Sequence, residues 1–379
     1  MHILPQGFRT AALAAGIKKE GLDLGLICSD RPANAAAVFT RNAFPAAPVL
    51  LSKAHLKQSG HVVRAILVNS GNANAAMGEP GMLAARQCAE LLASGIGCAP
   101  ADVFVASTGV IGRSLPVEKI YSAMPNLIAS LSPESPEGFS RAIMTTDTFP
   151  KVAGADVAGA AVLGFAKGAG MIHPNMATML SFIITDARID QPELERALRY
   201  AVDRSFHSIS VDGDTSTNDV VVVLANGSSG VSPNAGVFTE KLTGVCQELA
   251  KMIVRDGEGA SKFIELIIEG APSDDAAREI GRTIARSPLV KTAIYGCDPN
   301  WGRLIAAIGN SGVPLKSDNV DLYIDDIPLR GGDLKLASER MDQANVTIRV
   351  ALHSGDGQAR VWTCDFTEEY IKINADYTT

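Results

Sequence analysis

The stretch Lys167-Gly-Ala-Gly-Met-Ile-His-Pro-Asn-Met-Ala-Thr178-Met-Leu-Ser181 leads from a Gly-rich segment into an apolar run that opens on a threonine. An internal threonine hydroxyl is a weak nucleophile, because its pKa is high and it has no adjacent base. If the Ala177–Thr178 peptide bond is broken, Thr178 gains an α-amino group that titrates near neutral pH and can take the hydroxyl proton. The stretch therefore fits a chain that cuts itself and then uses Thr178 as nucleophile and base.

Local composition alone favours a plainer interpretation of this stretch. Threonine is a good strand residue, and a Gly-rich lead into a strand is common in loops. A catalytic role for Thr178 therefore depends on whether other segments of the chain fit the same chemistry.

Composition limits the classes to which the chain can belong. With 379 residues and 46% hydrophobic content, it can hold two domains with a large core. A net charge of −7 argues against a broad surface for nucleic acid or for an anionic membrane, so we expect neither partner. No apolar run approaches the length that spans a bilayer.

The cysteines and the start of the sequence indicate the compartment. The six cysteines are scattered and form no C-x-x-C pair, so we expect reduced, buried thiols. No charged segment followed by an apolar one opens the chain, so we expect no secretory signal. The expected setting is the cytoplasm.

Apolar runs and helical patterns alternate along the chain. The expected strands are 62–68, 103–106, 157–165, 179–184, 220–224, 263–268, 289–295, 320–324, 346–351 and 361–366. The expected helices are 191–204, 238–254, 273–286 and 300–307. This alternation indicates an α/β or α+β architecture. The natural division of the chain lies near residues 178–190, and no Pro/Ser-rich linker marks it.

Several familiar motifs are incomplete. The histidines never pair at metal-ligand spacing, and His173 fits a turn better than a metal or general-base role. Gly168-Ala-Gly170 lacks the third glycine of a dinucleotide site, and residues 255–262 do not fit the spacing of a phosphate-binding P-loop. Residues 212–219 begin like a calcium loop but lack its later glycine and glutamate, which favours a hydrogen-bonded polar turn. We predict neither a metal nor a cofactor.

Three other segments fit acyl-transfer chemistry. Ala106-Ser-Thr108-Gly109-Val-Ile-Gly112 follows an expected strand, and its N–H groups and the Thr108 hydroxyl could face a developing oxyanion. Residues 144–151 are rich in hydroxyls that suit amino or carboxylate groups, and Glu258 between two glycines offers a carboxylate to an ammonium group. Taken singly, these segments also fit a strand-ending turn, a solvated loop and an exposed glutamate.

Together the segments closely resemble the ornithine acetyltransferase (glutamate N-acetyltransferase, ArgJ) family, and the resemblance runs essentially end to end. The matching pieces are residues 7–9, 68–74 (Val-Asn-Ser-Gly-Asn-Ala-Asn), 107–112, 145–148, 167–178, 211–218, 255–260, 287–293, 298–303 (Asp-Pro-Asn-Trp-Gly-Arg) and 374–379. The longest pieces are highly specific and their order matches.

The resemblance implies an α/β (α+β) fold of the DmpA/ArgJ-like kind, in which mixed β-sheets are layered and flanked by helices. It implies autoproteolysis between Ala177 and Thr178, which leaves an α chain (1–177) and a β chain (178–379) that stay associated. It further implies that Thr108 and Gly109 form an oxyanion hole. The substrate site that it implies consists of Thr145, Lys167, Thr178, Glu258, Asn374 and Thr379.

The implied activity is transfer of acetyl from N-α-acetylornithine to glutamate through an acetyl-Thr178 intermediate, in the cyclic pathway of arginine biosynthesis. Acetyl-CoA could be a further acetyl donor, and the family suggests an α2β2 heterotetramer. Three alternatives stay open: a related self-processing aminopeptidase or amidase, a family member of a specialised metabolite pathway, and a non-catalytic binding protein for a small amino acid.

Overall fold

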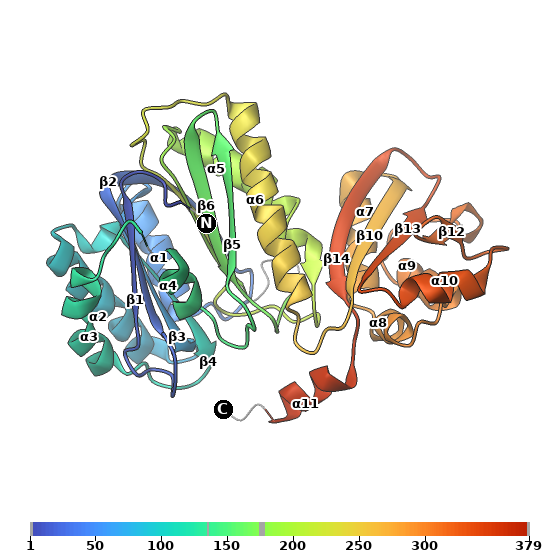
Figure 1. Cartoon of the computed structure of the whole chain (residues 1–379), viewed down its shortest axis with the longest axis horizontal. Helices are drawn as coiled ribbons and strands as arrows, with labels where there is room; N and C mark the ends of the chain where they lie inside the picture. Colours follow the sequence, from blue (N-terminus) through green and yellow to red (C-terminus); the bar gives the residue numbers. More distant parts are fainter. Residues whose placement is uncertain (1–2, 135, 174–178, 377–379) are drawn as a thin grey trace.

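The computed structural model describes residues 3–134, 136–173 and 179–376. Within these ranges, eight strands form one sheet (Figure 1). Its order is β4 (Val103–Val110), β3 (Val62–Asn72), β2 (Leu24–Phe39), β9 (Val220–Ala225), β7 (Leu180–Thr185), β6 (Ala160–Lys167) and β5 (Lys151–Val157), and β1 (Phe8–Leu13) pairs with β2.

The long strand β2 divides this sheet into two layers. Its first half pairs with β1 and β3, and its second half, from Asn34 to Phe39, pairs with β9. The pairing with β3 shifts register between Cys28 and Ala33, and the exposed segment 30–32 lies at this irregularity. Such an irregularity bends a strand and increases its twist. The bend allows the β1–β4 half to pack on the β5–β9 half.

Alternating side chains fill the space on both faces of each half. In β9, Val220, Val222 and Leu224 lie in the core between the two halves, whereas Val221 and Val223 face helices α5 (Gln191–Asp203) and α6 (Ala235–Arg255). On the other outer face, helices α1 (Ala47–Gln58), α2 (Gly78–Ile96) and α3 (Val117–Ala129) cover β2 to β4. The result is a four-layered body with helices outside and strands inside.

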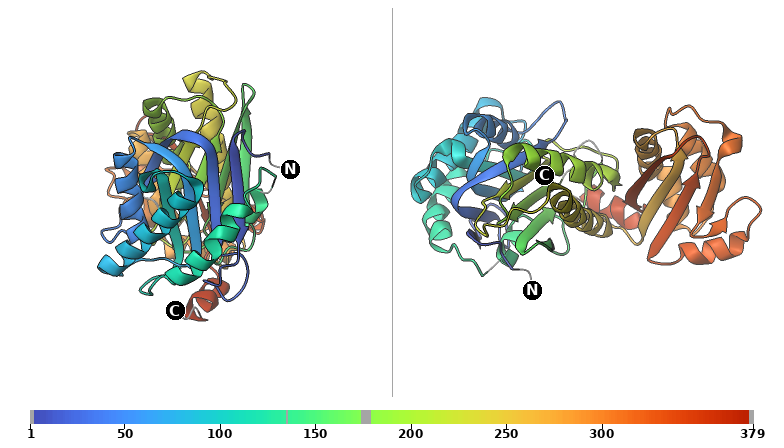
Figure 2. Two further views of the ribbon diagram at one scale, coloured as in Figure 1. Left: turned by 90° about the vertical axis from the view of Figure 1, so that its left-hand side faces the viewer. Right: turned by 90° about the horizontal axis from the view of Figure 1, so that it is seen from above.

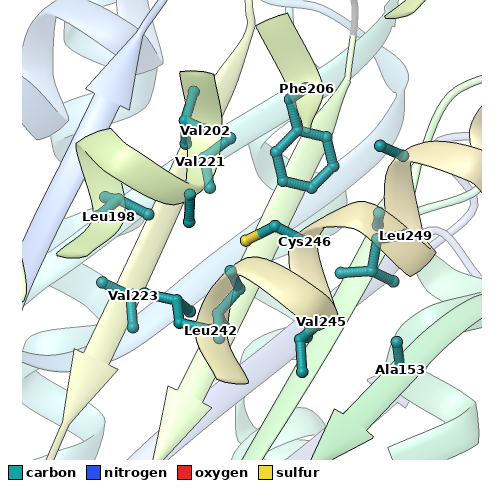
Figure 3. Packing of buried hydrophobic residues seen from close by; sticks show 14 of the residues in the cluster. Ala153, Leu198, Val202, Phe206, Val221, Val223, Leu242, Val245, Cys246 and Leu249 are labelled. Atoms are coloured by element: carbon teal, nitrogen blue, oxygen red, sulfur yellow. The ribbon is translucent and has the colours of Figure 1, made fainter. Parts of the chain in front are cut away.

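The core beneath α6 shows why these helices are fixed. Cys246 points from α6 toward the sheet and lies among Leu242, Val202, Val221 and Phe206, all of them buried (Figure 3). Burying a side chain such as Leu242, Val202 or Phe206 contributes about 1.5–3 kcal/mol to the stability of the fold. Burial also raises the pKa of the Cys246 thiol to about 12, so this sulfur behaves as a core group.

A second sheet lies at one end of this body, and all its strands except β8 appear orange to red in Figure 2. Its described strands run in the order β12 (Ile327–Pro328), β11 (Asp321–Ile324), β13 (Asn345–Ala351), β10 (Phe263–Ala271), β14 (Gly357–Cys364) and β8 (Ile209–Ser210). The remaining helices are α4 (Pro136–Ala142), α7 (Asp274–Ala285), α8 (Pro288–Tyr295), α9 (Trp301–Gly309), α10 (Leu334–Met341) and α11 (Glu368–Asp376). After β14, α11 runs back toward the first sheet (Figure 1). Mixed sheets flanked by helices confirm the expected fold class.

One expected strand was wrong, and another was wrong at its start. Residues 289–295 form α8, because Ser287 caps the N–H of Val290, Pro288 suits a first helical turn, and Val290, Ala293 and Ile294 bury one helical face. The expected strand 157–165 is a strand only from residue 160, where β6 begins, because its first residues lie at the end of β5 and in the turn of a hairpin. Ala158 and Gly159 take positive φ values of 55° and 93°, which is the geometry of a tight turn between β5 and β6.

The predicted division at residue 178 does not coincide with the division between the sheets. Strands β6 and β7, on either side of that residue, are hydrogen-bonded neighbours in the first sheet. The chain enters the second sheet mainly after α6. A cut at residue 178 would therefore leave two fragments that share one sheet. Within the described residues, no helix combines the length and apolarity that crossing a membrane requires.

Candidate active site

The candidate site lies where several strands of the first sheet end together. Strand β7 runs parallel to β9 and antiparallel to β6, so the start of β7 lies beside the start of β9 and the end of β6. These ends bring Lys167, Met179 and Asp219 to one edge of the sheet. The end of β4, with Thr108 and Gly109, reaches the same region.

A hollow of about 300 Å³ opens at this edge. It is lined by Thr108, Gly109, Val110, Ile111, Thr145, Thr146, Lys167, Gly170, Met171, Glu258 and Asn374. Six residues that the sequence predicts for the site are among them: Thr108, Gly109, Thr145, Lys167, Glu258 and Asn374. Ala177, Thr178 and Thr379 lie outside the described residues.

Position 109 requires a glycine, because strands β3 and β4 approach each other closely there. Its φ is +130°, and a Cβ at this position would lie 2.4 Å from the carbonyl carbon of Gly71 on β3. Any larger residue would force β3 and β4 apart. The adjacent Thr108 is buried at the end of β4 and still lines the hollow. A backbone and a hydroxyl held in this way are suited to stabilise an oxyanion.

Side-chain amides fix the segment that carries Thr108. Asn218 Nδ2 donates to the carbonyl oxygens of Ser107 (2.9 Å) and Ala73 (2.7 Å). The Ser107 hydroxyl in turn donates to Asn69 Oδ1 (2.6 Å). These groups are buried, so each bond also avoids the cost of an unsatisfied polar atom, about 1–3 kcal/mol. The segment that carries Thr108 is therefore held in place by buried hydrogen bonds.

Lys167 is 3% exposed and forms part of the wall of the hollow. Burial lowers the pKa of its ammonium group, and the carboxylates of Asp147, Asp219 and Glu258 oppose this shift. Among the described residues, no hydrogen bond satisfies its Nζ. An ammonium group in this position is suited to bind a carboxylate that enters the hollow.

Glu258 lies on the turn after α6 and faces the hollow. Its Oε2 accepts a hydrogen bond from Asn374 Nδ2 of α11 (3.0 Å). The carboxylate packs directly on Gly170, where an added Cβ would lie 2.3 Å from the carboxylate carbon. The absence of a side chain at Gly170 therefore provides the space that Glu258 occupies.

A buried lysine that the sequence did not single out lies behind the hollow. Lys151 is fully buried, and its Nζ donates to Asp147 Oδ1 (2.7 Å) and to Asp256 Oδ2 (2.5 Å). Burial alone would raise the pKa of Asp147. The Lys167 and Lys151 ammonium groups and the Gly168 N–H outweigh burial and hold that pKa at about 2.

The two carboxylates paired with Lys151 hold the segments that line the hollow. Asp147 accepts from the backbone N–H groups of Thr145 (2.9 Å) and Gly168 (2.6 Å). These bonds fix the backbone at Thr145 and beside Lys167, and so position both side chains. Asp256 accepts from the N–H and the hydroxyl of Thr148, and it lies two residues before Glu258. Only the hydroxyl-rich segment 144–151 hinted at this network in the sequence.

The segment 212–219 is the hydrogen-bonded polar turn that the sequence predicts. Asp212 accepts from the N–H groups of Ile172 (2.8 Å) and Asp214 (3.3 Å). Nearby His173 lies 3.2 Å from Ser210 Oγ, and burial together with Arg286 lowers its pKa to about 4, so it is uncharged at neutral pH. No cluster of three metal-ligating side chains occurs within the described ranges.

Two larger hollows are present: one of about 860 Å³ lies along α5 and α6, and one of about 380 Å³ lies between the C-terminal end of α5 and the second sheet with α7. They share Tyr200, Arg204 and Gln247, and the Arg204 guanidinium stacks over the Tyr200 ring at 3.7 Å. Neither contains a residue that the sequence predicts for catalysis. Chemistry rather than size therefore identifies the site.

Comparison with known proteins places the whole chain among relatives of one kind. A model of the ArgJ family matches residues 9–379. The arginine biosynthesis bifunctional protein ArgJ of Geobacter sulfurreducens is 47% identical, over 99% of this chain and 99% of that protein. Its counterpart in Thermus thermophilus is 48% identical, with the same coverage of both chains.

The chain is also similar to solved structures. One of them is the arginine biosynthesis bifunctional protein argJ of Bacillus halodurans, which is 43% identical with a TM-score of 0.51. The match covers 100% of that solved chain but 53% of this one. The solved chain is therefore about half as long as the chain described above.

Proposed function

The chain belongs to the ArgJ family, and from that premise we propose that it is a self-cleaving acetyltransferase of arginine biosynthesis. It transfers acetyl from N-α-acetylornithine to glutamate, with Thr178 as the acetyl carrier. The observation that carries the proposal is the hollow in which an oxyanion segment, a buried ammonium and a carboxylate meet.

The charges in the hollow suit both substrates. N-α-acetylornithine and glutamate share an α-carboxylate, which the Lys167 ammonium can bind. The δ-ammonium of acetylornithine is complementary to the Glu258 carboxylate, and Asn374 holds that carboxylate in place. Thr145 and Thr146 offer hydroxyls that can accept from or donate to either end of a substrate.

Activation requires scission of the Ala177–Thr178 bond. The Thr178 hydroxyl attacks the carbonyl carbon of Ala177, and an N→O acyl shift gives an ester that water hydrolyses. The new α-amine of Thr178 then serves as the base for its own hydroxyl. The half-length chain of the Bacillus halodurans relative supports this step, because a fragment beginning at residue 178 would also be just over half of this chain.

Turnover follows a ping-pong course. Thr178 Oγ attacks the acetyl carbonyl of N-α-acetylornithine, and the Thr108–Gly109 segment stabilises the tetrahedral oxyanion. Ornithine leaves with the proton that the Thr178 amine has taken. The amine of glutamate then attacks acetyl-Thr178 and yields N-acetylglutamate. One substrate replaces the other in the same hollow, so no second site is needed.

The finer details of assembly and donor are part of the same proposal. The two fragments remain together because they share the first sheet, and two such pairs form an α2β2 heterotetramer that works in the cytoplasm. Acetyl-CoA is a second acetyl donor, in keeping with the word bifunctional in the names of the relatives. No cofactor takes part.

An exchange assay tests the proposal. Purified protein is mixed with N-α-acetylornithine, with and without glutamate, and ornithine and N-acetylglutamate are measured. We expect ornithine release that depends on glutamate and an equal yield of N-acetylglutamate. Release that is indifferent to glutamate would instead identify an aminopeptidase or amidase, which passes the acyl group to water. A parallel reaction with acetyl-CoA and glutamate alone tests the second donor.

A further inference from the structure

Lys18 is a further lysine beside the candidate site, and the mechanism above does not use it. It lies in the segment between β1 and β2, and its side chain is half-buried. Its Nζ donates a hydrogen bond to the carbonyl oxygen of Met144 (3.1 Å) and forms no salt bridge with any described residue. An ammonium group has three N–H donors, so this bond leaves Lys18 with donors for a ligand.

A buried carboxylate fixes the backbone from which the Lys18 side chain starts. Asp23, the residue before β2, is fully buried. It accepts from the backbone N–H groups of Ala15 (2.6 Å), Ile17 (2.5 Å) and Lys18 (2.9 Å). Three bonds to one carboxylate hold this segment against the end of the sheet, so the flexible lysine stem extends from a fixed point.

Two contacts place the Lys18 side chain beside the wall of the hollow. Its stem packs on Gly71 of β3, where an added Cβ would lie 2.6 Å from Lys18 Cγ. Gly71 pairs with Gly109, which is part of the wall. At the other end of the side chain, the ammonium is bonded to Met144, and the next residue, Thr145, is also part of the wall. Lys18 therefore reaches from the oxyanion segment to the start of the hydroxyl-rich segment.

The electrostatics around Lys18 agree with this placement. Burial lowers the pKa of its ammonium group, and the carboxylates of Asp23 and Asp147 oppose that shift. The Lys167 ammonium lowers the pKa of Lys18 further, because two cations that lie near each other repel. Two ammonium groups at one hollow are suited to a ligand that carries two carboxylates.

The two substrates of the proposed reaction differ in the charge at the end of their side chains. Both carry an α-carboxylate, for which Lys167 is the partner. The side chain of N-α-acetylornithine ends in an ammonium group that Glu258 attracts, whereas that of glutamate ends in a carboxylate that Glu258 repels. Glutamate therefore needs a second cation at the hollow, and Lys18 is the lysine whose contacts place it there.

We propose that Lys18 binds the γ-carboxylate of glutamate and so selects the acetyl acceptor. This inference rests on the proposed acetyl transfer and adds a specificity-determining residue to it. Glu258 and Lys18 divide the two substrates between them: Glu258 holds the donor through its side-chain ammonium, and Lys18 holds the acceptor through its side-chain carboxylate. The α-amine of glutamate stays free to attack the acetyl group.

The substitution Lys18→Met tests this role, because methionine keeps much of the apolar stem and removes the charge. The burst of ornithine from N-α-acetylornithine without glutamate reports the first half of the reaction. The kcat/KM for glutamate reports the second half. We expect an unchanged burst rate and a kcat/KM for glutamate that is lower by about 10-fold or more, which is the effect of losing a hydrogen bond between charged groups.

Lys19→Met is the matched control, because Lys19 is the next residue and is exposed. Both half-reactions should be unchanged in this variant. If Lys18 only held the Met144 carbonyl in place, its loss would displace Thr145 and slow the burst as well. A slower burst in Lys18→Met, or glutamate kinetics equal to those of the control, would overturn the inference.

Glutamine as acceptor provides a test that does not depend on a variant folding, since it has the shape of glutamate with a neutral side chain. The unaltered protein should use glutamate at least about 10-fold better than glutamine, as measured by kcat/KM. Lys18→Arg should keep a preference for glutamate, and Lys18→Met should lose it. Equal use of both acceptors by the unaltered protein contradicts the inference and leaves acetyl transfer intact. If the unaltered protein transfers no acetyl to either acceptor, the proposed function fails and the inference fails with it.

Discussion

The substitution Gly170→Ala separates binding by Glu258 from the stability of the fold. A methyl group at Gly170 would lie 2.3 Å from the Glu258 carboxylate carbon, whereas an ordinary contact is 3.4–4 Å. The carboxylate must therefore move by more than about 1 Å and leave its 3.0 Å hydrogen bond with Asn374. The φ of Gly170 lies outside the left-handed region, so alanine fits the backbone.

The size of the effect follows from the contact that is lost. When the Glu258 carboxylate moves, the substrate loses its hydrogen bond to a charged group. Such a bond contributes about 1.5–3 kcal/mol to binding, and its loss corresponds to a decrease of roughly 10- to 150-fold in kcat/KM. Stability should change by no more than about 1 kcal/mol, because the atom that must move is the end of a flexible side chain. The expected variant is thus folded and cut, but slow with acetylornithine.

Steady-state kinetics with N-α-acetylornithine, together with urea unfolding, provides the assay. Gly244→Ala is the matched control, because a Cβ at that exposed helical position meets nothing within 4 Å. We expect unchanged kinetics for Gly244→Ala. If folded Gly170→Ala retains the kcat/KM of the unaltered enzyme, Glu258 does not bind substrate from the position described.

Three further predictions concern residues around the hollow. Lys151→Met should destabilise the protein by about 3–5 kcal/mol in urea, because it leaves two buried carboxylates unpaired, and no comparable loss is expected for Lys241→Met on the exposed side of α6. The pKa of Asp147 is about 2 in the folded protein and near 3.9 in the unfolded chain, so the ionised carboxylate stabilises the fold by about 2.5 kcal/mol. This stabilisation is present above pH ~4 and is lost as pH falls toward 2. The free energy of unfolding, measured against pH for the unaltered protein and for Asp147→Asn, checks this. Thr108→Ala should lower kcat by about 100-fold with little change in KM, and an unchanged kcat would remove its oxyanion role.

Elements with strong local signals were predicted well from the sequence. The run 220–224 proved to be β9, which is buried on both faces and therefore apolar throughout. The start of α7 was evident because Ser273 caps the helix and two aspartates follow it. The strand β2 was missed, since its bend at residues 30–32 is exposed and polar and interrupts the pattern of a single strand.

The candidate site was predictable in part from local sequence and in part from the motifs of a family. Thr108 and Glu258 were singled out from their own segments, Lys167 was named because of the family motifs, and the fold brings all three to one hollow. Lys151 could not be found in this way, because its role depends on the pairing of β5 with β6 and on the end of α6, which meet only in three dimensions. The position of Lys18, set by its contacts with Gly71 and Met144, is likewise a property of packing and not of sequence.

The central claim is that a broken backbone makes Thr178 the acetyl carrier. The most direct measurement is the N-terminal sequence and intact mass of the purified, active protein, before and after a brief reaction with N-α-acetylornithine. The account predicts a fragment that begins Thr178-Met-Leu-Ser181 and gains one acetyl group on that fragment. An active preparation that consists of one uncut chain, or that carries its acetyl group elsewhere, would contradict it.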